Sequence, residues 1–289
     1  MDSRIYCWAL TINRVPTDEE FWSCARVIEE VFPESHLAAM IRSGAPRSGG
    51  LVREVFCQLM PILMMKQQGI PRSKWRQYQT ENGKRWIDRD LERMHPARHL
   101  VSRMGYTTSA DLNMVVLAAA QGKTNHVVNI GLSVRRIAVQ PDRTRVKAWS
   151  QTIAHKLTQF ECRQLSGLED WPRLSRIWIL LTIKEALVDG LGQPQDFDFA
   201  RIECDVPNEV VRIDGQVLLG WEFRLFCSTQ ECVNMKGKTY HDHYQNTVAF
   251  YRGSNLTRIV FEQDPGDAAR FTTFCRLTDL LKVLHKLVE

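Results

Sequence analysis

Apolar and polar positions at the start of the chain predict a strand followed by two helices. Residues 5–12 form a mostly apolar run of strand length. Thr17-Asp18-Glu19-Glu20 then has the spacing of a capping box, and apolar residues recur at helical intervals from Phe21 to Phe32. The Gly-, Pro- and Ser-rich run 42–50 predicts a loop. A second helix is therefore expected over residues 51–68, with a kink at Pro61.

The pattern further along the chain predicts more strands and helices. Buried strands are expected over residues 111–118 and 127–139, and helices over 146–157 and 171–191. Short β-like runs separated by Gly, Pro, Asn or Asp follow at 199–204, 209–213, 217–227, 246–252 and 256–262. A helix over residues 274–288 is expected to end the chain. This order predicts an α+β fold with long antiparallel strands.

Composition restricts the class of protein. The chain has 289 residues, of which 44% are hydrophobic, and this is enough for a buried core. The 38 basic and 33 acidic residues form no long block of one sign, which favours a phosphate-bearing ligand or an acidic protein partner over nucleic acid. The eight cysteines have no C-x-x-C spacing and are expected to be reduced. We expect a cytoplasmic protein, because no signal-peptide pattern and no apolar run of the ~20 residues that span a membrane is present.

Five short segments contain most of the residues that can carry chemistry. They are residues 80–85 (TENGKR), 104–112 (MGYTTSADL), 130–137 (IGLSVRRI), 157–161 (LTQFE) and 177–186 (IWILLTIKEA). In this order they resemble the G-K-P, S-H, G-x-D-x-E, F-[ST]-x-x-E and W-[ST]-x-K-E-A motifs of Sfp-type 4′-phosphopantetheinyl transferases. Residues 220–226 and 244–249 are similar to the last strands of fungal members of that superfamily.

The resemblance implies a fold and a binding place. The fold is the pseudo-twofold phosphopantetheinyl transferase fold of two similar α/β halves, here residues 1–128 and 129–289. Coenzyme A is bound between the halves. In the family a magnesium ion is held by the Asp and Glu of G-x-D-x-E and by the Glu of K-E-A.

The chain departs from the family at the metal-binding positions. The resemblance places Ser133 and Arg135 where two acidic ligands belong, and Thr108 where the motif histidine belongs. Of the metal ligands only Glu185 is kept. Magnesium requires hard and preferably anionic oxygen ligands, whereas a guanidinium is a fixed cation. We therefore expect no metal site and no required cofactor, although coenzyme A binding stays possible, since Arg135 can also neutralise a phosphate.

The resemblance also assigns candidate roles. The candidate catalytic residues are Glu185, Lys184 and Glu161, with Glu185 as a base whose pKa is raised because it has lost its metal in a partly apolar cleft. The candidate ligand-binding residues are Arg53, Lys84, Arg85, Thr108, Ser133 and Arg135. Each has a structural alternative: the charged residues are common on solvated helix edges and surfaces, and Glu161 can accept a hydrogen bond from a loop.

Three hypotheses about function follow. The first is a metal-independent enzyme of specialised metabolism that cyclises, dehydrates or isomerises an apolar small molecule on the transferase scaffold. The second is a non-catalytic protein that binds coenzyme A or an acyl carrier protein. The third is a divergent but active transferase. The departures favour them in this order, because a lost metal site argues most directly against transfer.

A few further residues are weaker candidates. His241 and His243 flank Asp242 and share one face of a strand, but a metal site there needs more ligands. Tyr78, Tyr106, Asp111 and His126 lie near the expected cleft and can serve as acid or base, although a structural role is favoured for each. Trp149, Trp171, Trp178 and Trp221 are expected mostly in the core, with walls of an apolar ligand site as the alternative.

Overall fold

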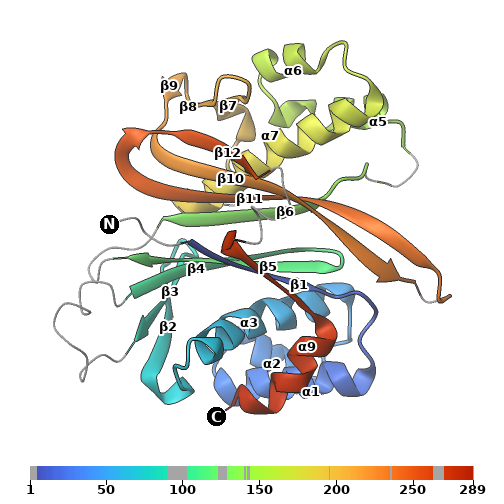
Figure 1. Cartoon of the computed structure of the whole chain (residues 1–289), viewed down its shortest axis with the longest axis vertical. Coiled ribbons are helices and arrows are strands. Elements are labelled where there is room, and N and C mark those ends of the chain that lie inside the picture. Colours follow the sequence, from blue (N-terminus) through green and yellow to red (C-terminus); the bar gives the residue numbers. More distant parts are fainter. Residues whose placement is uncertain are drawn as a thin grey trace.

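The computed structural model arranges the chain in four layers, which are helices, a sheet, a second sheet and further helices (Figure 1). The structure describes residues 5–89, 103–122, 129–139, 141, 144–194, 196–234, 236–262 and 270–288. Mixed helices and mostly antiparallel strands confirm the predicted α+β class.

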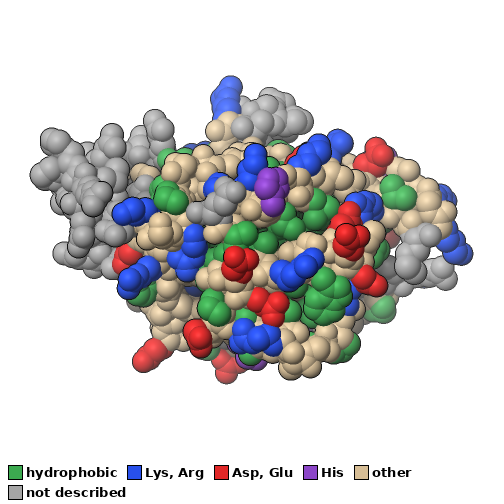
Figure 2. All heavy atoms as spheres, turned by 90° about the horizontal axis from the view of Figure 1, so that it is seen from below, with side chains coloured by type: hydrophobic (Ala, Val, Ile, Leu, Met, Phe, Trp, Pro, Cys, Tyr) green, Lys and Arg blue, Asp and Glu red, His purple; other side chains and the backbone are tan. Residues whose placement is uncertain are grey.

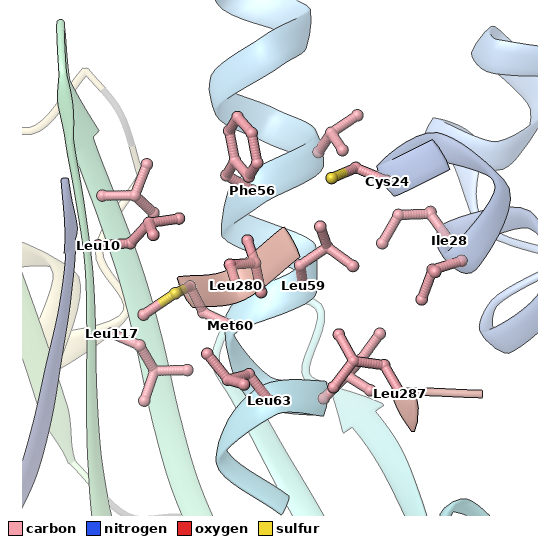
Figure 3. Packing of buried hydrophobic residues seen from close by; sticks show 14 of the residues in the cluster. Leu10, Cys24, Ile28, Phe56, Leu59, Met60, Leu63, Leu117, Leu280 and Leu287 are labelled. Carbon is pink, nitrogen blue, oxygen red and sulfur yellow. The ribbon is translucent and has the colours of Figure 1, made fainter. Parts of the chain in front are cut away.

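The first layer contains helices α1 (Asp18–Val31), α2 (His36–Arg42) and α3 (Gly49–Gln67). The predicted capping box is present, because the Thr17 hydroxyl accepts from the backbone N–H of Glu20 and the Glu20 carboxylate accepts from the N–H of Thr17. The α3 helix continues through Pro61. Figure 3 shows the core of this half, where α3 lies between α1 and the first sheet and Phe56 and Met60 are fully buried.

The first sheet lies on these helices and has six strands in the described part of the chain. Their order is β13 (Thr272–Arg276), β1 (Ile5–Thr11), β5 (Met114–Gly122), β4 (Arg103–Asp111), β3 (Arg85–Arg89) and β2 (Trp75–Gln79), and the short 3₁₀ helix η1 (Arg72–Lys74) precedes β2. The strand predicted over 111–118 is wrong at its start. Leu112 and Asn113 form the turn between β4 and β5, without the glycine that usually marks such a turn, and Leu112 adopts φ 44°.

The second sheet faces the first. Its order is β12 (Arg258–Glu262), β10 (Leu219–Val233), β11 (Thr239–Leu256) and β6 (Ile130–Arg136). Strands β10 and β11 are much longer than the runs that predicted them. Apolar side chains of β5, β6 and β11, including Val116, Val134 and Val248, fill the space between the two sheets.

Helices and a small sheet cover the other face of the second sheet. The helices are α5 (Val146–Thr152), η2 (Ala154–Lys156), α6 (Gln159–Leu165), α7 (Asp170–Leu191) and η3 (Phe199–Arg201), and the small sheet contains β7 (Ile202–Asp205), β8 (Val210–Ile213) and β9 (Gln216–Val217). The long helix α7 packs on β6 and β11. The buried Trp149, Trp178 and Trp221 belong to this core, whereas Trp171 is exposed.

The end of the chain differs from the prediction in two ways. Residues 274–276, predicted as helix, belong to β13, because this segment pairs in parallel with β1 at the start of the chain. Helix α9 (Leu277–Val283) and η4 (Leu284–Lys286) then pack in the core of the first half. Residues 272–288, expected in the second half, are therefore part of the first. The expected boundary after residue 128 adjoins residues 123–128, which lie outside the described residues.

The outer face of the helical layer carries basic and acidic side chains interspersed around apolar ones (Figure 2). On this face, charges of the two signs are therefore mixed. No helix in the described ranges has the length and apolar character needed to cross a membrane.

Candidate functional site

Strand β6 and helix α7 meet at the centre of the second half. A Cβ atom on Gly131 would lie 1.9 Å from the carbonyl oxygen of Ala186, so only glycine permits this approach. Side chains alternate along β6. Leu132 and Val134 face the first sheet, whereas Ser133 and Arg135 face α7. Ser133 and Arg135, which the resemblance assigned to metal-binding positions, thus lie against Glu185 of α7.

Ser133, Arg135 and Glu185 form one hydrogen-bonded group. The Ser133 hydroxyl donates to Glu185 Oε2 at 2.6 Å. Arg135 donates from Nε to Oε2 at 2.8 Å and from Nη2 to Oε1 at 3.1 Å, which is a bidentate ion pair. The side chain of Arg135 is 40% exposed, and that of Glu185 is 18% exposed. Glu185 is therefore not the unpartnered carboxylate that the sequence led us to expect.

These donors do not fit magnesium. The ion needs several hard oxygen ligands at close range, and carboxylates compensate its charge best. Both oxygens of Glu185 already accept hydrogen bonds, and the guanidinium of Arg135 places a fixed positive charge beside them. No group of three or more His, Cys, Asp or Glu side chains in the described ranges is placed to hold a metal ion.

The free edge of β6 is closed by side chains instead of by another strand. Its outward backbone N–H groups at Leu132, Val134 and Arg136 donate to Asp189 Oδ2 (3.0 Å), Ser109 Oγ (3.2 Å) and Asp111 Oδ2 (2.7 Å). Ser109 and Asp111 come from β4 of the first half. These three bonds satisfy N–H groups of an edge that would otherwise be unpaired, and the two bonds to Ser109 and Asp111 join the two halves. Asp111, a candidate acid or base, has this structural role.

Asp189 is a residue that sequence reasoning missed. It lies one turn after Glu185 on α7, and Thr107 also donates to its Oδ2, at 2.8 Å. No hydrogen bond to its Oδ1 is made by any residue in the described ranges, and the side chain is exposed to solvent. Although part of the side chain is exposed, the carboxylate is crowded by protein atoms, and this desolvation raises the pKa of Asp189, while the hydrogen bonds and the charges of Lys84 and Arg85 oppose the rise. Its i, i+4 spacing from Glu185 was the available signal.

Lys184 and Glu161 do not reach this group. Although Lys184 is adjacent to Glu185, consecutive helical side chains point ~100° apart, so Lys184 faces α6. Its Nζ donates to Glu161 Oε2 at 2.7 Å, and both side chains are 0% exposed. Glu161 also accepts from the backbone N–H groups of Thr158 and Cys204, both at 2.8 Å. This buried pair joins α6, α7 and β7, which favours a structural role for both residues, and their assignment as catalytic residues stays a prediction.

The predicted phosphate-binding residues divide into two places. Thr108 faces α3, where it hydrogen-bonds Cys57, on the opposite face of β4 from Thr107. Arg53 and Arg85 lie near the same thiol. Burial raises the pKa of Cys57 to about 11, whereas the Thr108 hydrogen bond and the charges of Arg85 and Arg53 lower it. Because Arg53, Arg85 and Thr108 all influence this one thiol and are all partly exposed, we refer to them together as the α3 cluster.

Lys84 lies apart from the α3 cluster. Its Nζ donates to the carbonyl oxygen of Gly190 at 2.5 Å and to the side chain of Asn129. A cation at this position satisfies a carbonyl at the end of α7 and is favoured by the helix dipole. Lys84 thus fastens the first half to α7, and fewer of its donors are left for a ligand.

The weaker candidates do not assemble into a site in the described ranges. Tyr106 is 1% exposed, and burial raises its pKa to about 12, so its phenol is a poor base at neutral pH. Tyr78 stacks on Trp86. His241 and His243 are exposed on one face of β11, where His243 bonds Thr229. His126 lies outside the described residues.

Comparison with known proteins agrees with the motifs. No protein-family model matches the chain. The chain is similar to a protein described as 4′-phosphopantetheinyl transferase pptA from Paxillus involutus, with 27% identity over 180 residues. The match covers 60% of this chain and 65% of that protein, so it spans just under two thirds of the curated relative. The resemblance to a fungal member of the phosphopantetheinyl transferase superfamily, inferred from the motifs, is thereby confirmed.

Proposed function

We propose that this phosphopantetheinyl transferase-like protein binds coenzyme A without magnesium and does not transfer phosphopantetheine. The observation that carries this proposal is the bidentate pair between Arg135 and Glu185, with Ser133 as the third member. Of the three positions that would hold the metal, one is a neutral hydroxyl, one is a cation and the third is already neutralised. This is the second of the three functions considered from the sequence.

The α3 cluster supports binding of a phosphate. Arginine presents a planar fork of N–H donors that matches phosphate geometry and stays charged at every physiological pH. Arg53 and Arg85 supply two such groups and Thr108 supplies a hydroxyl, and all three influence the pKa of one thiol on α3. Coenzyme A is the phosphate-bearing ligand that the resemblance implies. Because the cluster is on the first half, it is separate from the lost metal position.

The structure weakens the case for an acid–base enzyme that uses the residues named from the sequence. Lys184 and Glu161 are buried in their own ion pair, and Glu185 has no free oxygen. The acid–base hypothesis now depends on Asp189, whose Oδ1 accepts no hydrogen bond from the described residues. An apolar small molecule would have to reach this oxygen.

Two measurements test the proposal. The purified chain is incubated with coenzyme A, magnesium and an apo acyl carrier protein, and the carrier is weighed by mass spectrometry. No mass gain is expected, and robust modification would contradict the absence of transfer. Calorimetric titration with coenzyme A in EDTA should release or absorb heat, and a flat titration would contradict binding.

A matched pair of variants locates the binding. Arg85→Gln should weaken coenzyme A binding about ten- to hundredfold, because hydrogen bonds to charged groups contribute roughly 1.5–3 kcal/mol. Arg26→Gln removes the same charge from an exposed position of α1 and should leave the affinity unchanged. Equal effects of the two substitutions would mean that only net charge matters and that the α3 cluster is not the site.

A further inference from the structure

We propose that Arg135 is a built-in counter-cation that replaces a divalent ion, and that exchanging two side chains of β6 is enough to open a divalent-cation site against Glu185. This inference deepens the proposed function and rests on it only in treating Glu185 as a remnant of a metal site. It assigns to Arg135 the role of holding acidic groups together at the junction of the two halves.

The first argument concerns charge. The Arg135 guanidinium donates to both carboxylate oxygens of Glu185, and Asp111 reaches the same strand, where it accepts from the backbone N–H of the neighbouring Arg136 at 2.7 Å. Two carboxylates from different halves of the fold therefore lie within electrostatic reach of one guanidinium. Without that cation the carboxylates would repel each other in a partly desolvated place. A metal ion would neutralise them in the same way.

The second argument concerns rigidity. One edge of β6 is paired with β11 over the whole of residues 130–136. The N–H groups of its other edge are bonded to Asp189, Ser109 and Asp111. Because the backbone is fixed on both edges, new side chains at positions 133 and 135 must leave it in the directions that Ser133 and Arg135 take now. Carboxylates placed there would point at Glu185.

The test is a metal titration of the double variant Ser133→Asp/Arg135→Glu. Manganese(II) is the probe, because the paramagnetic resonance signal of the free ion disappears when the ion is bound. We expect the double variant to bind about one ion per chain through hard carboxylate oxygens. The wild-type chain should leave the signal unchanged. Manganese should also raise the melting temperature of the double variant and not that of the wild type.

The single variant Ser133→Asp is the matched control. It adds one carboxylate but keeps the guanidinium, so it should bind no manganese. If Ser133→Asp gains the ion as strongly as the double variant, Arg135 does not exclude metal and the inference is wrong. A folded double variant that leaves the manganese signal unchanged overturns it as well.

A second pair keeps the inference testable if the double variant does not fold without metal. Arg135→Gln should lower the melting temperature, since it leaves the charges of Glu185 and Asp111 without their cation. Adding Glu185→Gln to Arg135→Gln should recover part of the loss. A single Arg135→Gln variant as stable as wild type would show that no counter-cation is needed. None of these readouts uses coenzyme A, so a failed coenzyme A titration of the wild type leaves this test independent.

Discussion

The buried pair of Lys184 and Glu161 yields a quantitative prediction. Lys184→Met keeps an unbranched side chain that is one heavy atom shorter, and it removes the charge. The Lys184 ammonium donates to Glu161, to the carbonyl of Lys156 at 2.9 Å and to the carbonyl of Phe199 at 3.1 Å. Glu161 would stay fully buried with an uncompensated charge. Removal of one partner of such a pair costs about 3–5 kcal/mol of unfolding free energy.

The companion variant separates charge from packing. In Lys184→Met/Glu161→Gln both charges are absent, and the amide oxygen can still accept from Cys204 or Thr158. The double variant should therefore lose less stability than the sum of the two single variants, by roughly 0.5–3 kcal/mol. The assay is urea denaturation followed by circular dichroism for the wild type, both single variants and the double variant.

Two results would refute this reasoning. One is a loss of less than ~1 kcal/mol for Lys184→Met, which would mean that water or another group replaces the ammonium. The other is strict additivity, which would mean that the two residues act independently. Where Lys184→Met is folded, its affinity for coenzyme A should match that of the wild type. A selective loss of binding would return Lys184 to the functional site.

Three further predictions concern the contacts around β6. Gly131→Ala should abolish soluble expression or lower the free energy of unfolding by several kcal/mol, because the new Cβ would overlap the carbonyl of Ala186. The control Gly50→Ala should leave the melting temperature nearly unchanged, because its Cβ would meet only Ser48 Oγ, at 3.6 Å. Ser133→Ala should cost about 1 kcal/mol in urea denaturation, because it removes one hydrogen bond from Glu185 and keeps the ion pair; a loss as large as that of Arg135→Gln would contradict this division. Asp189→Asn tests a pH dependence. Because the folded pKa of Asp189 is raised, the stability that Asp189 contributes is fully present below the unfolded pKa of ~3.9 and is lost as pH rises through the folded pKa. The variant should therefore be more stable than the wild type at pH 7 and lose this advantage in acid, and a difference in stability that is constant across pH would contradict the raised pKa.

Local patterns determined several elements in advance. The capping box at Thr17 and Glu20 fixes the start of α1, because both of its hydrogen bonds form within one turn of chain. The apolar run at residues 5–12 and the helix over 171–191 were also predicted within one residue of their bounds as β1 and α7. The motifs placed Ser133 and Arg135 two residues apart on a strand, which sets them on one face.

Longer-range contacts decided what local patterns left open. Residues 274–276 suit a helix by local pattern, and they form a strand because β1, at the other end of the chain, offers them a partner. Likewise Asp111 and Asp189 are distant in sequence, and both are used to close the edge of β6. No local pattern contains these pairings, because they exist only when the two halves meet.

The sequence alone determined the α+β class, the superfamily resemblance and the presence of a hydroxyl and a guanidinium where that resemblance expects two acidic groups. It did not determine the role of the residues that were kept. Lys184 and Glu185 are neighbours in the motif, yet the helical turn of ~100° per residue sends one into a sealed ion pair with Glu161 and the other to Arg135. Which of two adjacent charges is buried depends on what packs against each face of α7, and only the tertiary structure supplies that information.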